Sequence, residues 1–136
     1  MIKTVNLLFT CVENACRSQM AAGFARHFGG EDVNVYSGGS KPADRVNENA
    51  VKVMKERGVD ISSQEATEIG SEAAEKADFV ITMGCGPDAC PVPVGGKTIE
   101  WDLEDPAGKS IEKFREVRDE IENKVKDLLD RISEGV

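Results

Sequence analysis

Residues 5–18 have the sequence VNLLFTCVENACRS, and this stretch decides how the rest of the chain is interpreted. Its first five residues are apolar enough to predict a buried strand, and Met20, Phe24 and Phe28 follow at helical spacing. The segment Cys11–Ser18 therefore lies where a strand is expected to end and a helix to begin. A loop in that position points backbone N–H groups and the positive end of the helix dipole at one spot, which favours a tetrahedral oxyanion.

Three side chains of this loop suit nucleophilic catalysis. Cys11 is the expected nucleophile, because a helix N-terminus and a nearby cation can lower the pKa of a cysteine from about 8.5 to roughly 3.5–7.5. Arg17 offers a planar, bidentate fork for the oxyanion. Ser18 can donate its hydroxyl to the sulfur, both when the sulfur attacks and when it leaves. We expect the substrate to be bound by Val12, Glu13, Asn14, Ala15, Cys16, Arg17 and Ser18.

The alternative is that two small buried cysteines and a surface arginine happen to share this loop. It explains less well why a strand precedes them, why a helix follows them and why Ser18 is adjacent. The sequence therefore favours a nucleophilic loop.

The composition limits the class of protein. A chain of 136 residues with 40% hydrophobic content predicts one domain, residues 1–136, large enough to bury a core. The formal net charge of −8 argues against a nucleic-acid surface. The sequence has neither a secretion signal nor an apolar run of about eighteen residues, so no membrane partner is expected. We expect a cytoplasmic monomer.

Short apolar segments alternate with amphipathic segments along the chain. The expected strands are Val5–Phe9, Val33–Tyr36, Phe79–Met83 and Thr98–Trp101. The expected helices cover residues 20–28, 46–54, 71–76 and 110–132. Neither a helix nor a strand is predicted for residues 60–70. The alternation predicts an α/β three-layer sandwich, a parallel sheet flanked by helices on both faces, with the ligand crevice at the carboxyl ends of the strands.

That crevice is expected to gather residues from three loops. Cys85 and Cys90 lie in a glycine- and proline-rich loop after the third strand, and a thiol pair beside Cys11 suits a relay. Cys85 could attack an adduct on Cys11, leaving a disulfide that Cys90 resolves. Asp105 follows the fourth strand and could protonate an oxygen leaving the tetrahedral centre. Alternatively, Asp105-Pro106-Ala107-Gly108 is only a turn before the last helix.

Two further alternatives concern the cysteines. Four thiolates, Cys11, Cys16, Cys85 and Cys90, could hold zinc or a cluster. Each pair has four intervening residues, wider than in the usual zinc ribbons, and a metal would fill the oxyanion cradle, so we expect no metal. Cys85 and Cys90 could also be inert loop residues. The single histidine, His27, is expected at the surface.

Four motifs in order give the chain a family resemblance that runs from about Val5 to Glu120. They are Cys11–Met20, Val35–Gly38, Thr82–Pro91 and Trp101–Lys109. In these motifs the chain resembles the low-molecular-weight protein tyrosine phosphatases and, within that fold, the thioredoxin-coupled arsenate reductases.

The resemblance implies a four-stranded parallel sheet and a division of roles. Cys11 would attack arsenate, Arg17 and the loop amides would hold it, and Asp105 would be the acid. Cys85 and Cys90 would carry the disulfide to thioredoxin. No bound cofactor is implied, and phosphate or sulfate would mimic the substrate.

The chain departs from the family pattern at several positions. Glu13 stands where the phosphatases and many reductases have glycine, so its carboxylate must point away from the anion. Ala22 stands where some reductases have a glutamate that contributes to a potassium site, so that site is not carried over. The cysteine loop is shorter than in the best-known members, and some similar reductases take electrons from a low-molecular-weight thiol.

The sequence thus leads to one expected function and two alternatives. The first is reduction of arsenate to arsenite for detoxification, through the Cys11, Cys85 and Cys90 relay. The closest alternative is a phosphatase that hydrolyses phosphomonoesters through a phosphocysteine on Cys11 and has no use for a relay. Such phosphatases usually carry aromatic residues near the acid, where this chain offers mainly Trp101, itself expected in the core. The second alternative is a four-cysteine metal-binding redox sensor.

Overall fold

A computed structural model describes residues 4–83 and 97–133. Within these residues the chain forms one four-stranded sheet, in which all neighbouring strands are parallel and follow the order β2-β1-β3-β4. The strands are β1 (Val5–Cys11), β2 (Val33–Gly39), β3 (Phe79–Met83) and β4 (Lys97–Trp101). The helices are α1 (Arg17–Gly29), η1 (Gly30–Asp32), α2 (Glu48–Lys55), α3 (Ser71–Lys76) and α4 (Ile111–Ser133). The predicted α/β architecture with a four-stranded parallel sheet is confirmed.

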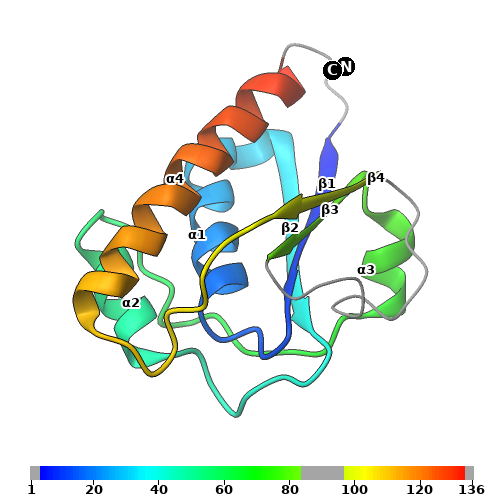
Figure 1. The fold of residues 1–136 in the computed structure, drawn as a ribbon. Helices are drawn as coiled ribbons and strands as arrows, with labels where there is room; N and C mark the ends of the chain where they lie inside the picture. Colours follow the sequence, from blue (N-terminus) through cyan, green and yellow to red (C-terminus); the bar gives the residue numbers. More distant parts are fainter. Residues whose placement is uncertain (1–3, 84–96, 134–136) are drawn as a thin grey trace.

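The helices cover both faces of the sheet, with α1, α2 and α4 on one side and α3 on the other (Figure 1). Side chains alternate between the faces along β1, as the pleat of a strand requires. Leu7 and Phe9 enter the larger core under α1, α2 and α4. Leu8 belongs to a smaller cluster with Ala74 and Ala77, at and just after α3. The sheet is therefore buried on both faces, as is usual for parallel sheets.

Strand β1 reaches two residues beyond the predicted end at Phe9. It lies in the middle of the sheet and pairs with β2 through Cys11 and with β3 through Thr10. Pairing on both edges extends the strand through a polar residue that the apolar pattern did not include. As a result, Cys11 itself stands at the carboxyl edge of the sheet.

Helix α2 begins at Glu48, two residues after the predicted start at residue 46. The side-chain oxygen of Asn47 accepts a hydrogen bond of 2.8 Å from the backbone N–H of Asn49 and so caps the helix. Val46 precedes the cap and is buried. Gly58 follows the helix at a φ of 76°, a conformation that glycine adopts without strain.

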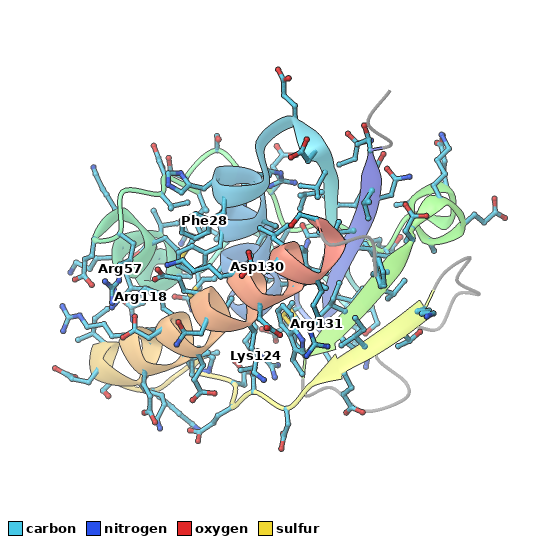
Figure 2. The ribbon with its side chains drawn as sticks, turned by 90° about the horizontal axis from the view of Figure 1, so that it is seen from above. Phe28, Arg57, Arg118, Lys124, Asp130 and Arg131 are labelled. Carbon is cyan, nitrogen blue, oxygen red and sulfur yellow. The ribbon has the colours of Figure 1, made fainter. Side chains whose placement is uncertain are left out.

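Helix α4 starts after Ser110, whose Oγ accepts from the backbone N–H of Lys113 at 3.4 Å. Helix α4 packs on α1 and α2, and its buried stripe consists of Phe114, Val117, Arg118, Ile121, Val125 and Leu128. Arg57 and Arg118 lie near the start of α4, whereas Lys124, Asp130 and Arg131 lie toward its other end (Figure 2). No helix in the described ranges is long and apolar enough to cross a membrane.

The polar residues 60–70 form no regular strand, but they make a bridge to the sheet. Gly39 pairs with Glu68, and the backbone N–H of Gly39 donates to the carbonyl of Thr67 at 2.9 Å. This contact brings the segment beside the end of β2, close to the loop that follows β1. His27 is exposed and Trp101 is buried, both as predicted.

Candidate active site

The loop between β1 and α1 is the centre of the candidate site. Cys11 is the last residue of β1 and is only 3% exposed, and α1 begins six residues later at Arg17. The structure thus places the loop at the carboxyl edge of the sheet, as the sequence predicts. Val12 is half-buried, and Glu13 is exposed, as its position in an anion-binding loop requires.

The backbone of the loop is fixed from outside by the segment after β2. Three loop carbonyls, those of Val12, Glu13 and Ala15, accept hydrogen bonds of 2.8–3.0 Å from backbone N–H groups. The donors are Lys41, Ala43 and Asn47, respectively. In a trans peptide, a carbonyl and the N–H that follows it point in opposite directions. The N–H groups that follow these carbonyls therefore point away from the flanking segment, toward the inside of the loop, as an oxyanion cradle requires.

Gly39 allows this close approach. A Cβ atom at this position would lie 2.8 Å from the carbonyl oxygen of Cys11 and 2.9 Å from the backbone nitrogen of Asn14. Any side chain would push the loop away from the end of β2. The sequence predicts no role for Gly39. Gly39 is the last residue of β2 and pairs with Cys11, and this tertiary pairing, which a single sequence does not show, is what identifies it.

Cys11 is joined to Ser18 and Asn14 by a short chain of hydrogen bonds. The Sγ of Cys11 lies 2.9 Å from the Oγ of Ser18, and that hydroxyl donates to the Oδ1 of Asn14 at 2.7 Å. A hydroxyl has one hydrogen, so in this arrangement the Cys11 thiol donates to Ser18. A Cys11 thiolate would instead accept, with the serine hydrogen turned to the sulfur. The Ser18 hydroxyl can therefore accept a hydrogen bond from a Cys11 thiol or donate one to a Cys11 thiolate.

Asn14 holds the loop in an unusual backbone conformation. Its φ is 50°, in the left-handed region that non-glycine residues adopt infrequently. The backbone carbonyl of Asn14 accepts from the Nε2 of Gln19 at 2.8 Å, and its side-chain amide donates to the carbonyl of Thr67 at 3.4 Å. Both partners are residues for which the sequence predicted no role.

Arg17 lies against the segment that follows β4. Its guanidinium is almost fully buried, and Nη1 donates to the carbonyl of Leu103 at 3.1 Å. The Nη2 atom lies 3.7 Å from the Oδ2 of Asp105. The other carboxylate oxygen, Oδ1, accepts from the backbone N–H of Ala107 at 3.0 Å. Asp105 therefore both shapes the turn and faces the loop, so the two interpretations of its role are compatible.

The second cysteine of the loop has a different environment from the first. Cys16 is buried, and burial, followed by the charge of Asp105, raises the pKa of its thiol to about 12. It therefore stays a neutral thiol at physiological pH. Cys11 and Cys16 are both free of disulfide bonds.

The predicted relay cysteines, Cys85 and Cys90, lie outside the described residues. In residues 4–83 and 97–133, no three His, Cys, Asp or Glu side chains are grouped so that they could hold a metal ion. Of the predicted catalytic residues that the structure describes, Cys11 contacts Ser18, and Arg17 pairs with Asp105.

Known proteins share this sequence and fold. The chain matches the profile of the low molecular weight phosphotyrosine protein phosphatases over residues 6–89 and 94–136. An arsenate reductase of Halalkalibacterium halodurans is 44% identical over 128 residues, which are 88% of this chain and 91% of the relative.

Solved structures of arsenate reductases have a similar fold. The thioredoxin-dependent arsenate reductase Cg_ArsC1' of Corynebacterium glutamicum superimposes with a TM-score of 0.84 and 34% identity. The match covers 98% of this chain but only 64% of that longer one. An arsenate reductase in the phosphate binding state has a TM-score of 0.82 and 37% identity over 95% of this chain and 99% of its own. The chain therefore belongs to the low molecular weight phosphotyrosine protein phosphatase family and, within it, to the arsenate reductases.

Proposed function

We propose that the chain reduces arsenate to arsenite for detoxification, by a relay in which Cys11 attacks arsenic and Cys85 and Cys90 carry the resulting disulfide. The observation that carries the proposal is the contact of 2.9 Å between the Cys11 sulfur and the Ser18 hydroxyl, at the start of a loop that Arg17 closes. This arrangement provides a nucleophile, a group that stabilises its charge and a cation for the oxyanion.

The first step forms a bond between the Cys11 sulfur and arsenic and breaks one arsenic–oxygen bond. The oxygen leaves as water after protonation, for which Asp105 is the available acid. Its Oδ2 lies beside Arg17, and its carboxylate is about half exposed, so it can be reprotonated from solvent. The arsenic remains As(V) at this stage.

The second step transfers two electrons. The Cys85 thiolate attacks the Cys11 sulfur, a Cys11–Cys85 disulfide forms, and the electron pair of the sulfur–arsenic bond leaves with arsenic as arsenite, As(III). Cys90 then attacks Cys85, which forms a Cys85–Cys90 disulfide and frees the Cys11 thiolate. We propose that a thioredoxin dithiol reduces this last disulfide. The thioredoxin-dependent relative supports this donor, and a low-molecular-weight thiol is the alternative. Cytoplasm, where thiols are kept reduced, is the proposed location.

The same cradle should accept phosphate, since arsenate and phosphate share shape and charge. A similar arsenate reductase is known in a phosphate binding state. Hydrolysis of phosphomonoesters through Cys11 is therefore the second candidate function. Trp101 lends it no support, because its ring packs in the core against Phe9 with centroids 5.9 Å apart. We propose at most a side activity.

The test is arsenate-dependent oxidation of NADPH in the presence of thioredoxin and thioredoxin reductase. Wild type should turn over, and the separate variants Cys11→Ser, Cys85→Ser and Cys90→Ser should each lose turnover. Glu72→Gln, an exposed position on α3, is the control and should turn over like wild type. If wild type is inactive with thioredoxin and with glutathione plus glutaredoxin, yet hydrolyses p-nitrophenyl phosphate through Cys11, the phosphatase function replaces the reductase.

A further inference from the structure

Gln19 is a fully buried amide directly beside the proposed site. It is the third residue of α1, and all of its side-chain polar atoms are bonded. Nε2 donates to the carbonyl of Asn14 at 2.8 Å and to that of Glu65 at 2.9 Å. Oε1 accepts from the Nε2 of Gln64 at 2.6 Å. A buried amide with every polar group satisfied is held in one orientation.

The bond to Asn14 fixes a particular peptide of the loop. The carbonyls of Val12, Glu13 and Ala15 are held by backbone N–H groups, whereas that of Asn14 is held by a side chain. Because the peptide is planar and trans, the N–H of Ala15 points opposite to the Asn14 carbonyl. When Gln19 holds this carbonyl outward, the N–H of Ala15 therefore turns to the inside of the loop.

The same peptide follows the strained residue. A left-handed φ of 50° at Asn14 persists only where the surroundings enforce it. Gln19 binds the backbone of Asn14 directly, whereas Ser18 and Thr67 bind its side chain. Without the Gln19 amide, this peptide would be free to rotate about ψ of Asn14 and φ of Ala15, which would turn its carbonyl oxygen toward the anion.

We propose that Gln19 is a positioning residue of the oxyanion site, which acts by locking the peptide between Asn14 and Ala15 so that its N–H faces the bound oxyanion. It does not touch the anion. The role rests on the proposed function only in that the anion held there is arsenate or its mimic phosphate.

Gln64 allows a control variant, because it contacts Gln19 but has no bond to the Asn14 carbonyl among the contacts described. Its Nε2 orients Gln19, and its own Oε1 accepts from the Nη1 of Arg26 at 2.7 Å. A Gln64→Met variant leaves both Gln19 N–H bonds in place and removes the bonds of Gln64 to the Oε1 and backbone carbonyl of Gln19 and to Arg26. A Gln19→Met variant keeps much of the side-chain volume but removes both donors.

The experiment measures phosphate affinity by calorimetric titration of the reduced protein, a readout that requires no turnover. Gln19→Met should raise the Kd for phosphate about tenfold or more, the cost of one lost hydrogen bond to a charged group. The KM for arsenate should rise in parallel, with a smaller change in kcat. Gln64→Met should change the Kd by less than about threefold, because the donors to Asn14 remain.

An unchanged phosphate Kd in folded Gln19→Met, together with a lowered Tm, would show that Gln19 only stabilises the fold and would overturn the proposal. If the variant does not fold, wild-type protein still decides the question by NMR. The amide resonance of Ala15 should shift strongly when phosphate is added, and the absence of a shift would also overturn the proposal. A failure of arsenate reduction with intact phosphate binding would instead refute the proposed function.

Discussion

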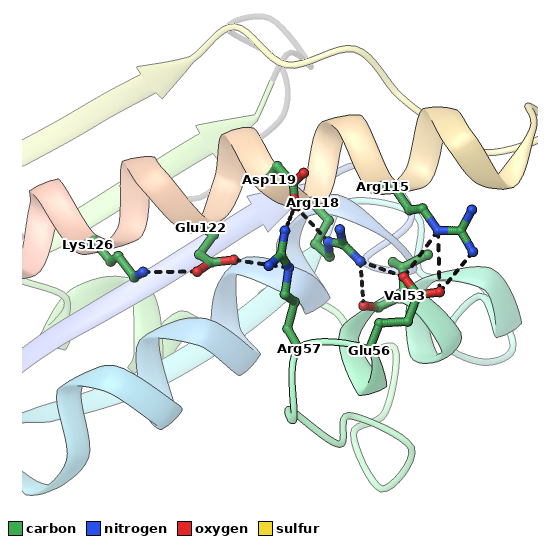
Figure 3. A network of polar contacts seen from close by, with 8 residues as sticks. All are labelled: Val53, Glu56, Arg57, Arg115, Arg118, Asp119, Glu122 and Lys126. Atoms are coloured by element: carbon green, nitrogen blue, oxygen red, sulfur yellow. Dashed lines mark hydrogen bonds and ion pairs between the residues drawn. The ribbon is translucent and has the colours of Figure 1, made fainter.

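Two polar networks of this fold use charge differently. The α2–α4 network joins α2 to α4 and consists of Glu56, Arg57, Arg115, Arg118, Asp119 and Glu122 (Figure 3). The loop network lies at the carboxyl edge of the sheet and consists of Cys11, Asn14, Arg17, Ser18 and Gln19. The first pairs cations with carboxylates, whereas the second is built mainly from neutral amides and hydroxyls.

In the α2–α4 network, charges of opposite sign meet directly. Glu56 accepts from Arg118 at 2.7 Å and from Arg115 at 2.9 Å. These hydrogen bonds, with that of Arg115 the largest effect, lower the pKa of Glu56 to about 2. Arg57 pairs with Asp119 at 2.9 Å and approaches Glu122 at 3.6 Å. The network neutralises itself and therefore fits a structural role.

In the loop network, the cation is bonded to a neutral group and has a carboxylate at a longer distance. Arg17 donates to the backbone carbonyl of Leu103 and lies 3.7 Å from one oxygen of Asp105. Arg118, which is buried to a similar degree, instead lies 2.7 Å from Glu56 and 2.9 Å from Asp119. Burial of an arginine therefore does not by itself indicate its function, because the charges of its partners must also be known.

Replacement of Arg17 should have the largest effect. Arg17→Lys keeps the charge but loses the planar fork, so kcat/KM for arsenate should fall by about 10²–10³-fold, as for the loss of one oxyanion donor. Arg115→Lys in the α2–α4 network is the control and should leave kcat/KM within about twofold, as expected for a surface change. Equal losses in the two variants would remove the distinction between the networks.

Asp105→Asn should have the next largest effect. The amide keeps the turn oxygen that binds Ala107 but cannot protonate the leaving oxygen, so kcat should fall by about 10²-fold. Single-turnover release of arsenite reports this step directly. Glu104→Gln, one residue earlier and paired with Lys109 at the surface, is the matched control and should be active. Full activity of Asp105→Asn would mean that Asp105 serves only the turn.

Arg118→Met should affect stability and spare catalysis. The substitution removes the hydrogen bond of 3.0 Å to the buried carbonyl of Val53 and the bond to Glu56. The free energy of unfolding should fall by about 1–3 kcal/mol. Urea denaturation measures this loss, and kcat per folded molecule should be unchanged. A selective loss of kcat would contradict the structural role of the α2–α4 network.

The smallest effect is expected for Glu56→Gln and depends on pH. Folding lowers the pKa of Glu56 from 4.5 to about 2. The ionised carboxylate therefore stabilises the protein fully at pH values above 4.5, and this stabilisation is lost as the pH falls from 4.5 toward about 2. Wild type should melt a few degrees above the variant at neutral pH. This difference in Tm should shrink as the pH is lowered below about 4.5. A difference independent of pH would exclude the ionic contribution.

The sequence predicted the elements whose signals are local. The apolar run of residues 5–9, the helical spacing after it and the adjacency of Arg17 and Ser18 placed the nucleophilic loop between a strand and a helix. Element ends were less accurate, because β1 is extended by pairing on both edges and α2 starts where Asn47 caps it.

The supports of the loop could not be predicted in the same way. Gly39 and Thr67 reach the loop only through the tertiary approach of β2 and residues 60–70, which carry no periodic pattern. Gln19 follows Ser18 directly, but its role depends on a backbone carbonyl of Asn14 and on Gln64, 45 residues away. Contacts between distant segments leave no signal in a single sequence.

The central claim, a two-electron relay that starts at Cys11, is tested most directly by a single turnover without a thiol donor. Reduced protein would be mixed with excess arsenate, arsenite would be counted, and disulfides would be mapped by mass spectrometry. The account predicts one arsenite per chain, a Cys85–Cys90 disulfide in wild type and a trapped Cys11–Cys85 disulfide in Cys90→Ser. No arsenite, or arsenite released while Cys85 stays reduced, would contradict it.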